Sequence, residues 1–365
     1  MKNNSARFRL KQDEIEVLMQ YRGIKEATDE AGVDDKDVKH GWLKTKQASL
    51  FFKNPNFKAE ELNAIQQIKD ECIKEVKKYA PKYTDTAIKY DIDTAIKYDI
   101  DTDGHLLVID IADLHIGKLA TAFETGEEYN SQIAVKRAKD GLQGILNKAK
   151  GFNIDKVLFV AGNDILHTDN NKRTTNAGTP QDTDGMWYDN FIMAKNLYID
   201  LLEKLISFAE VEVVYNPSNH DLTHGFFLMQ LIEAHFANST IKFNVNLLHR
   251  KAFKYGNNLI GTTHGDGAKI EHLPLLLATE FPILWSETKH RYIYSHHVHH
   301  KTSKDFIGVT FETLRSPSGT DSWHHKNGYT GVPKAVEGYI HHKEFGQIAR
   351  LTHIFSVLFL FSLYL

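Results

Sequence analysis

Five short motifs in this chain combine histidine, aspartate and asparagine in ways that could bind metal ions. They are Asp113-Leu114-His115, Asn163-Asp164, Asn219-His220-Asp221, His264-Gly265-Asp266 and His297-Val298-His299. Mixed carboxylate, amide and imidazole groups suit borderline divalent ions such as Mn, Fe or Zn better than a thiolate site or an all-oxygen cage would. One such motif arises easily by chance, but five in succession predict a metal centre.

Each motif directly follows a segment that is typical of a β-strand. Residues 105–111 (HLLVIDI), 156–161 (KVLFVA) and 211–215 (VEVVY) are short apolar runs rich in branched side chains. Apolar residues spaced as on one helix face occupy 135–149 and 191–205. This alternation predicts an α/β sheet with helices on its faces. Because loops at strand ends build the sites of such sheets, we expect the motifs to converge.

A second sheet is predicted farther along the chain. The segment 252–263 (AFKYGNNLIGTT) places a Gly-Asn-Asn turn between two strand-like runs, which indicates a hairpin. The segment RYIYSH that precedes the last motif is also strand-like. This sheet is expected to be more mixed than the first.

The motifs together resemble those of the calcineurin-like metallophosphoesterases over residues 105 to about 340. The resemblance implies an α/β (α+β layered) fold of two facing mixed β-sheets flanked by helices, with two metals at the strand ends. It implies that Asp164 bridges both metals. The ligands that it implies for the first metal are Asp113, His115 and His299, and those for the second are Asn219, His264 and His297.

The expected chemistry is hydrolysis of a phosphoester. Two divalent ions, with Mn as the first choice and Fe or Zn as alternatives, would clamp the phosphate and lower the pKa of a bridging water. By the resemblance, His220 held by Asp221 would act as general acid, a role that suits an imidazole whose pKa is near neutrality.

Three positions depart from the family pattern. The second motif reads Gly-Asn-Asp where Gly-Asp is usual, and we expect Asp164 rather than Asn163 to bridge. Ser218 and His296 replace glycines that normally precede Asn-His and His-x-His. These two replacements require backbone angles that a residue with a side chain can adopt.

The substrate prediction depends on His167, three residues after Asp164. A histidine there resembles the DNA repair exonuclease (double-strand-break repair nuclease) branch, whereas protein phosphatases of this fold have Asp-Arg-Gly. We therefore expect DNA as the substrate and a catalytic role for His167 in stabilising the phosphate. Candidate substrate-binding residues are Lys172, Arg173 and Arg315, and Trp187 and Trp323 either line a cleft or pack in the core.

Two alternatives stay open. The same chemistry could act on a phosphoprotein or a small phosphoester, or the chain could be a DNA-binding protein with an inactive metal site. The cap domain of the long repair nucleases is not evident after His299. We therefore do not predict an ATPase partner of the kind that those nucleases have. A homodimer is one option for the assembly.

The outer segments complete the predicted domain organisation. Residues 1–80 are expected to be helical, with a helix-turn-helix-like pattern around Trp42 and Leu43, and 81–103 to be a linker in which TAIKYDID occurs twice. The phosphoesterase domain is placed at 104–345 and an apolar tail at 346–365. The tail is expected to be a final packed element or the product of a shifted reading frame, with a membrane anchor as the minority interpretation.

Composition sets further limits. The 365 residues carry a net charge of only −3, so any nucleic-acid surface must be local. The single cysteine, Cys72, excludes an internal disulfide and fits a reducing compartment. The N-terminus lacks a signal-peptide pattern, so a cytoplasmic protein with no membrane association is expected.

Overall fold

The computed structural model describes residues 40–44, 49–53, 67, 69–82 and 103–356 of the chain. The chain divides into two compact units, residues 1–75 and 76–365. The duplicated octapeptide, the first 39 residues and residues 357–365 lie outside the described residues, so the predictions for them are untested.

The first unit contains an antiparallel hairpin of β1 (His40–Lys44) and β2 (Ser49–Lys53). The helix predicted around Trp42 and Leu43 is therefore wrong. Both segments are short and carry aromatic residues, which favour strands over helices. Residues 69–78 are helical, as expected for that end of the segment.

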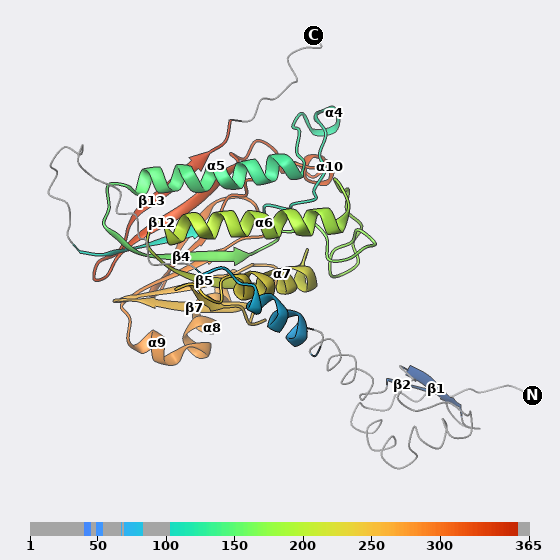
Figure 1. Cartoon of the computed structure of the whole chain (residues 1–365), viewed down its shortest axis with the longest axis horizontal. Helices are drawn as coiled ribbons and strands as arrows, with labels where there is room; N and C mark the ends of the chain where they lie inside the picture. Colours follow the sequence, from blue (N-terminus) through green and yellow to red (C-terminus); the bar gives the residue numbers. More distant parts are fainter. Residues whose placement is uncertain (1–39, 45–48, 54–66, 68, 83–102, 357–365) are drawn as a thin grey trace, which may run out of the picture. The chain divides into compact units, whose positions relative to one another are not determined.

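The second unit contains two sheets (Figure 1), with six strands in the order β13-β12-β3-β4-β5-β6 and five in the order β10-β11-β9-β8-β7. The six-stranded sheet consists of β3 (His105–Asp110), β4 (Ile154–Gly162), β5 (Glu210–Asn216), β6 (Lys242–Asn244), β12 (Ala335–His342) and β13 (Gly346–Ile354). The five-stranded sheet consists of β7 (Arg250–Tyr255), β8 (Asn258–Thr263), β9 (His290–Ser295), β10 (Thr302–Phe306) and β11 (Val309–Thr313). The strands predicted from the apolar runs and the predicted β7–β8 hairpin are confirmed.

Helices cover the outer face of the six-stranded sheet, where α5 and α6 run side by side (Figure 1). The longer helices are α5 (Ser131–Ala149), α6 (Trp187–Ile206), α7 (Leu222–His235) and α8 (Leu273–Glu280). The shorter ones are α4 (Ala122–Thr125), η2 (Ile270–His272), α9 (Pro282–Ser286) and α10 (Ser322–Lys326). The helices predicted over 135–149 and 191–205 are thus confirmed as α5 and α6.

Strand β3 shows how one strand serves two cores. Leu107 and Ile109 belong to the core beneath the helices, whereas Leu106 and Val108 belong to the core shared with Ile260 of the other sheet. Successive side chains of a strand point to opposite faces, so a strand covered on both sides must be apolar throughout. The predicted layered α/β fold of two facing sheets flanked by helices is confirmed.

The C-terminal boundary differs from the prediction. Residues 346–354 form β13, which pairs antiparallel with β12, so the sheet continues past the boundary expected at residue 345. Most side chains of this edge strand are half-buried or exposed, as expected for a strand with a neighbour on one side only. Among the described residues, no helix is both long and apolar enough to cross a membrane.

The two sheets bring their parallel strands to a common edge. Strands β3, β4 and β5 are parallel neighbours in one sheet, and β8 and β9 are parallel neighbours in the other. All five metal-binding motifs follow the carboxyl ends of these strands. The fold therefore places the motifs together, as the sequence predicted.

His341 on β12 provides a test of this packing through pH. Its side chain is fully buried, its Nε2 lies 2.9 Å from the Tyr294 hydroxyl, and burial lowers the pKa of His341 to about 3. The unfolded chain binds a proton near pH 6.5, whereas the folded chain does not until about pH 3. The contribution of His341 to the free energy of unfolding is therefore fully present above pH 6.5. It falls by about 1.4 kcal/mol for each pH unit below that.

His341→Gln should keep the hydrogen bond and remove this titration. We expect the free energy of unfolding, measured by urea denaturation at pH 7, 5.5 and 4.5, to fall less steeply in His341→Gln than in the wild type. His325→Gln, a change at an exposed position, should leave the slope unchanged. Equal slopes in all three proteins would contradict the prediction.

Candidate metal centre

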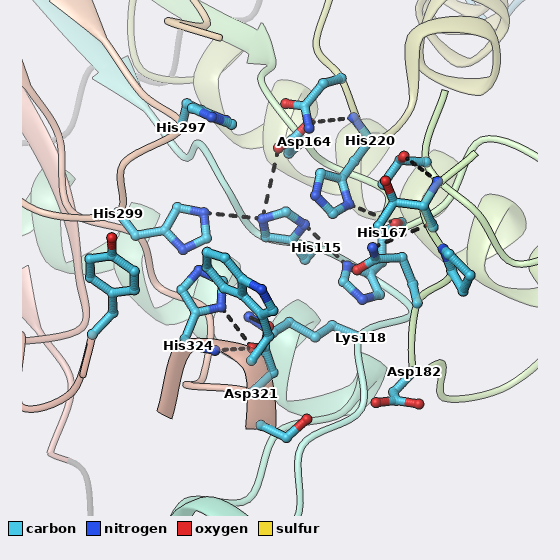
Figure 2. Close-up of a pocket in the computed structure, with 18 of the residues that line it drawn as sticks. His115, Lys118, Asp164, His167, Asp182, His220, His297, His299, Asp321 and His324 are labelled. Carbon is cyan, nitrogen blue, oxygen red and sulfur yellow. Dashed lines mark hydrogen bonds and ion pairs between the residues drawn. The ribbon is translucent and has the colours of Figure 1, made fainter. Parts of the chain in front are cut away.

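Seven histidine, aspartate and asparagine side chains converge where the strands of both sheets end. Figure 2 shows four of them, His115, Asp164, His297 and His299. Strand β3 is followed by Asp113 and His115, β4 by Asp164, β5 by Asn219, β8 by His264, and β9 by His297 and His299. The structure therefore brings together the residues that the sequence predicted as ligands, although they are separated by up to 186 positions in the chain.

The backbone at these strand ends adopts angles that non-glycine residues rarely take. Among the described residues, seven non-glycine residues have positive φ, and only Arg173 lies outside the predicted motifs. Such a conformation costs about 1–3 kcal/mol and persists only where the surrounding structure enforces it. The other six are Asp113, His115, Asn163, Asp164, His297 and His299.

The first cluster consists of Asp113, His115 and His299, whose potential ligand atoms all lie within 4.8 Å of one another. The Nε2 atoms of His115 and His299 are 3.2 Å apart, and the Nε2 of His299 is 3.6 Å from the Oδ1 of Asp113. Two imidazole nitrogens and a carboxylate oxygen thus face one point. This is the set predicted for the first metal.

The second cluster consists of Asp164, His264 and His297, again within 4.8 Å. Asn219 joins it, because its Oδ1 lies 2.9 Å from the Nε2 of His264. The Oδ2 of Asp164 is 3.2 Å from the Nε2 of His264 and 3.9 Å from the Nε2 of His115 in the first cluster. Asp164 therefore lies between the clusters, at the position where a bridging ligand is required.

Asn163 has a different environment from its neighbour Asp164. Its side chain is buried, and neither its Oδ1 nor its Nδ2 has a hydrogen-bond partner among the described residues. Asn163, the extra residue of the second motif, thus occupies the left-handed turn before Asp164, and the carboxylate of Asp164 lies beside both clusters.

The electrostatics of the first cluster fit a metal site. Burial lowers the pKa of His115 well below its usual value and that of His299 to about 4, so both imidazoles are neutral at pH 7. Burial raises the pKa of the Asp113 carboxyl, but the neighbouring His299 and His264 together outweigh this effect and lower it. Neutral imidazole and ionised carboxylate are the forms that bind metal ions.

The second cluster holds a proton that a metal would displace. Burial alone would lower the pKa of His264, but the carboxylates of Asp164 and Asp113 raise it to about 9. The Nδ1 of His264 is buried and has no partner among the described residues. The donor set and its charge fit a divalent ion, and loading this cluster near pH 7 should release a proton.

The partner of His220 differs from the prediction. Its Nδ1 lies 2.8 Å from the backbone carbonyl oxygen of His167, and because a carbonyl can only accept, Nδ1 carries the proton. Asp221 does not contact that ring: its carboxylate accepts hydrogen bonds from the Ser218 hydroxyl at 2.6 Å and the Leu166 amide at 2.9 Å. Burial and then the charge of Asp164 raise the pKa of Asp221 to about 7. Asp221 therefore supports the loops, whereas the carbonyl of His167 orients His220.

His167 is buried beside the first cluster. Its Nδ1 lies 3.3 Å from the Nδ1 of His115, and its ring stacks on that of His220, with centroids 5.2 Å apart. The three histidines form a further group whose ring nitrogens lie within 4.8 Å of one another. Both His167 and His220 line the cavity described below.

The two residues that replace family glycines are tied into the structure by their side chains. Neither Ser218 nor His296 has a positive φ, so no glycine is needed at either position. The Ser218 hydroxyl accepts a hydrogen bond from the Asp164 amide at 2.7 Å, and the Nε2 of His296 lies 2.6 Å from the Oδ2 of Asp110. Both replacements therefore support the strand ends.

A cavity of about 510 Å³ opens beside the clusters. Its floor contains His115, Asp164 and His299, and its walls come from the loop at 175–182 and from the segment around α10. Lys172, Arg173 and Arg315, the predicted substrate-binding residues, are not among the residues that line it.

The predicted phosphate contacts lie elsewhere. Lys172 and Arg173 are in an exposed loop, where the guanidinium of Arg173 contacts the sulfur of Met186. The Nη1 of Arg315 is 2.7 Å from an oxygen of buried Glu337, so its charge is already paired. Their predicted role is not supported by these positions.

Comparisons with known proteins give a fold-level likeness and no family assignment. No protein-family model matches the chain, and no curated protein does. Three solved structures illustrate the likeness. Vps29 complexed with zinc from Entamoeba histolytica is 14% identical over 68% of this chain and 99% of its own, with a TM-score of 0.30. A predicted phosphoesterase from Streptococcus pneumoniae is 12% identical over 69% of this chain and 98% of its own, with a TM-score of 0.28. A dimetal phosphatase from Danio rerio is 11% identical over 69% of this chain and 99% of its own, with a TM-score of 0.33.

None of these three is a DNA repair exonuclease, so the predicted branch gains no support from them. At such TM-scores the likeness carries no functional weight. The function must be inferred from the geometry of the site.

Sequence reasoning missed one wall of the cavity. Lys118 is 1% exposed, and its Nζ lies 2.9 Å from the Oδ2 of Asp321; both residues line the cavity with His324. The only sequence signal is that Lys118 follows His115 by three residues. Nothing in the sequence near Asp321 connects it to Lys118, because 202 residues separate them.

Proposed function

We propose that this protein is a divalent-metal-dependent phosphoester hydrolase with a calcineurin-like metallophosphoesterase centre. The observation that carries the proposal is the position of Asp164, whose carboxylate lies between two histidine-containing clusters at the shared edge of the two sheets. When bound, two metal ions would polarise the phosphate and supply a water of lowered pKa as nucleophile.

The residues of the chain would complete the reaction. His115 and His299 would serve the first ion with Asp113, and Asn219, His264 and His297 the second. His220 has its Nδ1–H fixed by the carbonyl of His167, so Nε2 would have to carry a second proton, in the imidazolium form, and would pass that proton to the leaving oxygen. The stacked ring of His167 would keep His220 in place and exclude water from one side of the phosphate.

The proposed substrate is a phosphodiester of DNA. A cavity of about 510 Å³ is of the size that encloses a small organic ligand, and it fits a nucleotide unit. The alternative is a phosphoprotein or small phosphoester. Two observations favour this alternative. Acidic Asp182 and Asp321 line the cavity, and the basic residues that were predicted to bind the substrate do not line it.

A substrate panel tests the proposal. We expect purified protein with added manganese to hydrolyse bis-p-nitrophenyl phosphate and to degrade single-stranded DNA, and to do neither in EDTA. His220→Ala should lower DNA cleavage about 10²-fold, because a general acid contributes roughly this much, and should lower hydrolysis of bis-p-nitrophenyl phosphate less, because p-nitrophenolate leaves without a proton. His249→Ala, at an exposed position away from the cavity, should have no effect.

The outcomes separate the alternatives. Turnover of the small diester or a phosphopeptide without DNA cleavage would move the substrate to the second class. Salt-dependent DNA binding without hydrolysis in any divalent metal would identify a DNA-binding protein with an inactive site and overturn the proposal.

A further inference from the structure

Two large aromatic side chains stand exposed on the wall of the cavity. Trp323 and Tyr329 are 61% and 55% exposed, and both line the cavity. Their rings are nearly parallel, with an interplanar angle of 22° and centroids 5.9 Å apart. Aromatic rings gain free energy when they are covered, so two aligned rings beside a reaction centre indicate a surface that a ligand covers.

The segment that carries these rings is held firmly. Asp321 caps α10 by accepting a hydrogen bond from the His324 amide at 2.8 Å, and it also pairs with buried Lys118. The Tyr329 amide donates to the His324 carbonyl at 2.9 Å. The aromatic pair is therefore preorganised rather than placed on a loose loop.

The aromatic pair is connected to the metal clusters through one ring. His324 stacks on His299 of the first cluster, with centroids 5.1 Å apart and an interplanar angle of 12°. Trp323 contacts the edge of His324, with centroids 5.0 Å apart. A group attached to a phosphate at the clusters could therefore reach the aromatic pair.

We propose that Trp323 and Tyr329 form a stacking platform for the nucleobase attached to the phosphoester that is hydrolysed. This proposal rests on the proposed function. A planar, polar heterocycle suits this place better than an apolar side chain, because Lys118, Asp321 and His300 line the same cavity as the two rings. Stacking is tolerant of sequence, because every base has a π-face. The base could belong to a DNA strand or to a free nucleotide.

The test measures binding as well as turnover. The ligands are dAMP, a dA tetranucleotide and 2-deoxyribose 5-phosphate, which lacks a base, and binding is measured by isothermal titration calorimetry in EDTA and in manganese. We expect Trp323→Ala to weaken dAMP and tetranucleotide binding about 5- to 100-fold and to leave the base-free ligand unaffected. Tyr329→Ala should act in the same direction, and Trp323→Phe should retain part of the affinity.

Phe345→Ala is the matched control, because Phe345 is 71% exposed and lies between β12 and β13, away from the cavity. Tighter binding of the tetranucleotide than of dAMP would identify a strand as the source of the base, and equal binding a free nucleotide. Equal affinity for the base-free ligand, or no effect of Trp323→Ala and Tyr329→Ala, would overturn the platform. Loss of the platform would leave the proposed function intact if the protein still hydrolyses bis-p-nitrophenyl phosphate in manganese. If the protein hydrolyses no phosphoester, the proposed function itself is wrong.

Discussion

Replacing Asp164 with asparagine should lower the turnover of any phosphoester that the protein hydrolyses by about 10³-fold or more. The Asp164 carboxylate lies between the two clusters, 3.2 Å from the Nε2 of His264 and 3.9 Å from that of His115. An amide carries no charge, and if its oxygen keeps the place of Oδ1, its nitrogen replaces Oδ2, the oxygen that lies near both clusters. The amide of His220 can still donate to the remaining oxygen, as it does to Oδ1 at 3.0 Å, so the fold should be preserved.

Metal binding gives a readout that does not depend on turnover. Ions that bind only the folded chain raise its melting temperature in proportion to the logarithm of their concentration. We expect manganese to stabilise the wild type and to stabilise Asp164→Asn much less. Circular dichroism in EDTA should show that both proteins are folded.

Asn163→Gly is the matched control for this change. Glycine accepts the positive φ of Asn163, and it removes an amide that has no hydrogen-bond partner among the described residues. We expect this variant to keep its manganese-dependent stabilisation and to lose less than about 10-fold in turnover, well short of the 10²–10³-fold cost of removing a group that stabilises the transition state. The reverse pattern, with Asn163→Gly inactive and Asp164→Asn active, would make Asn163 the bridging residue.

The main features of the fold and the convergence of the motifs could be predicted because they depend on local patterns. Apolar runs such as 105–111 and 156–161 identify strands buried on both faces, and parallel strands end at the same edge of a sheet. Asp113, Asp164 and Asn219 could therefore be placed together, because they follow β3, β4 and β5 of one sheet. The resemblance to a known family supplied the pairing of ligands that this placement alone leaves open.

The features that could not be predicted depend on contacts between distant residues. The resemblance implied that Asp221 holds His220, yet its carboxylate turns toward Ser218 and Leu166. The pairing of Lys118 with Asp321 follows from the path of the chain after β11, for which the sequence gives no periodic signal. Around Trp42, a loose helix-turn-helix pattern was outweighed by strand propensity.

His296 supports the site from the interior, and its replacement should be costly. The side chains of His296 and Asp110 are both fully buried, and the His296 ring also lies 3.1 Å from the carbonyl oxygen of Thr263. Burial raises the pKa of Asp110, and its Oδ1 has no hydrogen-bond partner among the described residues, so His296 is the group that satisfies this carboxyl. We expect His296→Ala to lower the free energy of unfolding by about 3–5 kcal/mol, as measured by urea denaturation in EDTA.

A double-mutant cycle separates the lost pair from the lost packing. Asp110→Ala should also destabilise the protein. The loss in free energy of unfolding of the double variant should be about 1–3 kcal/mol smaller than the sum of the losses in the two single variants. Because the φ of His296 is not positive, His296→Gly should be no more stable than His296→Ala. Additive effects would show that the two side chains act independently. Coupling would show instead that the buried pair of His296 and Asp110 acts as a unit that fixes the strand end from which His297 and His299 project.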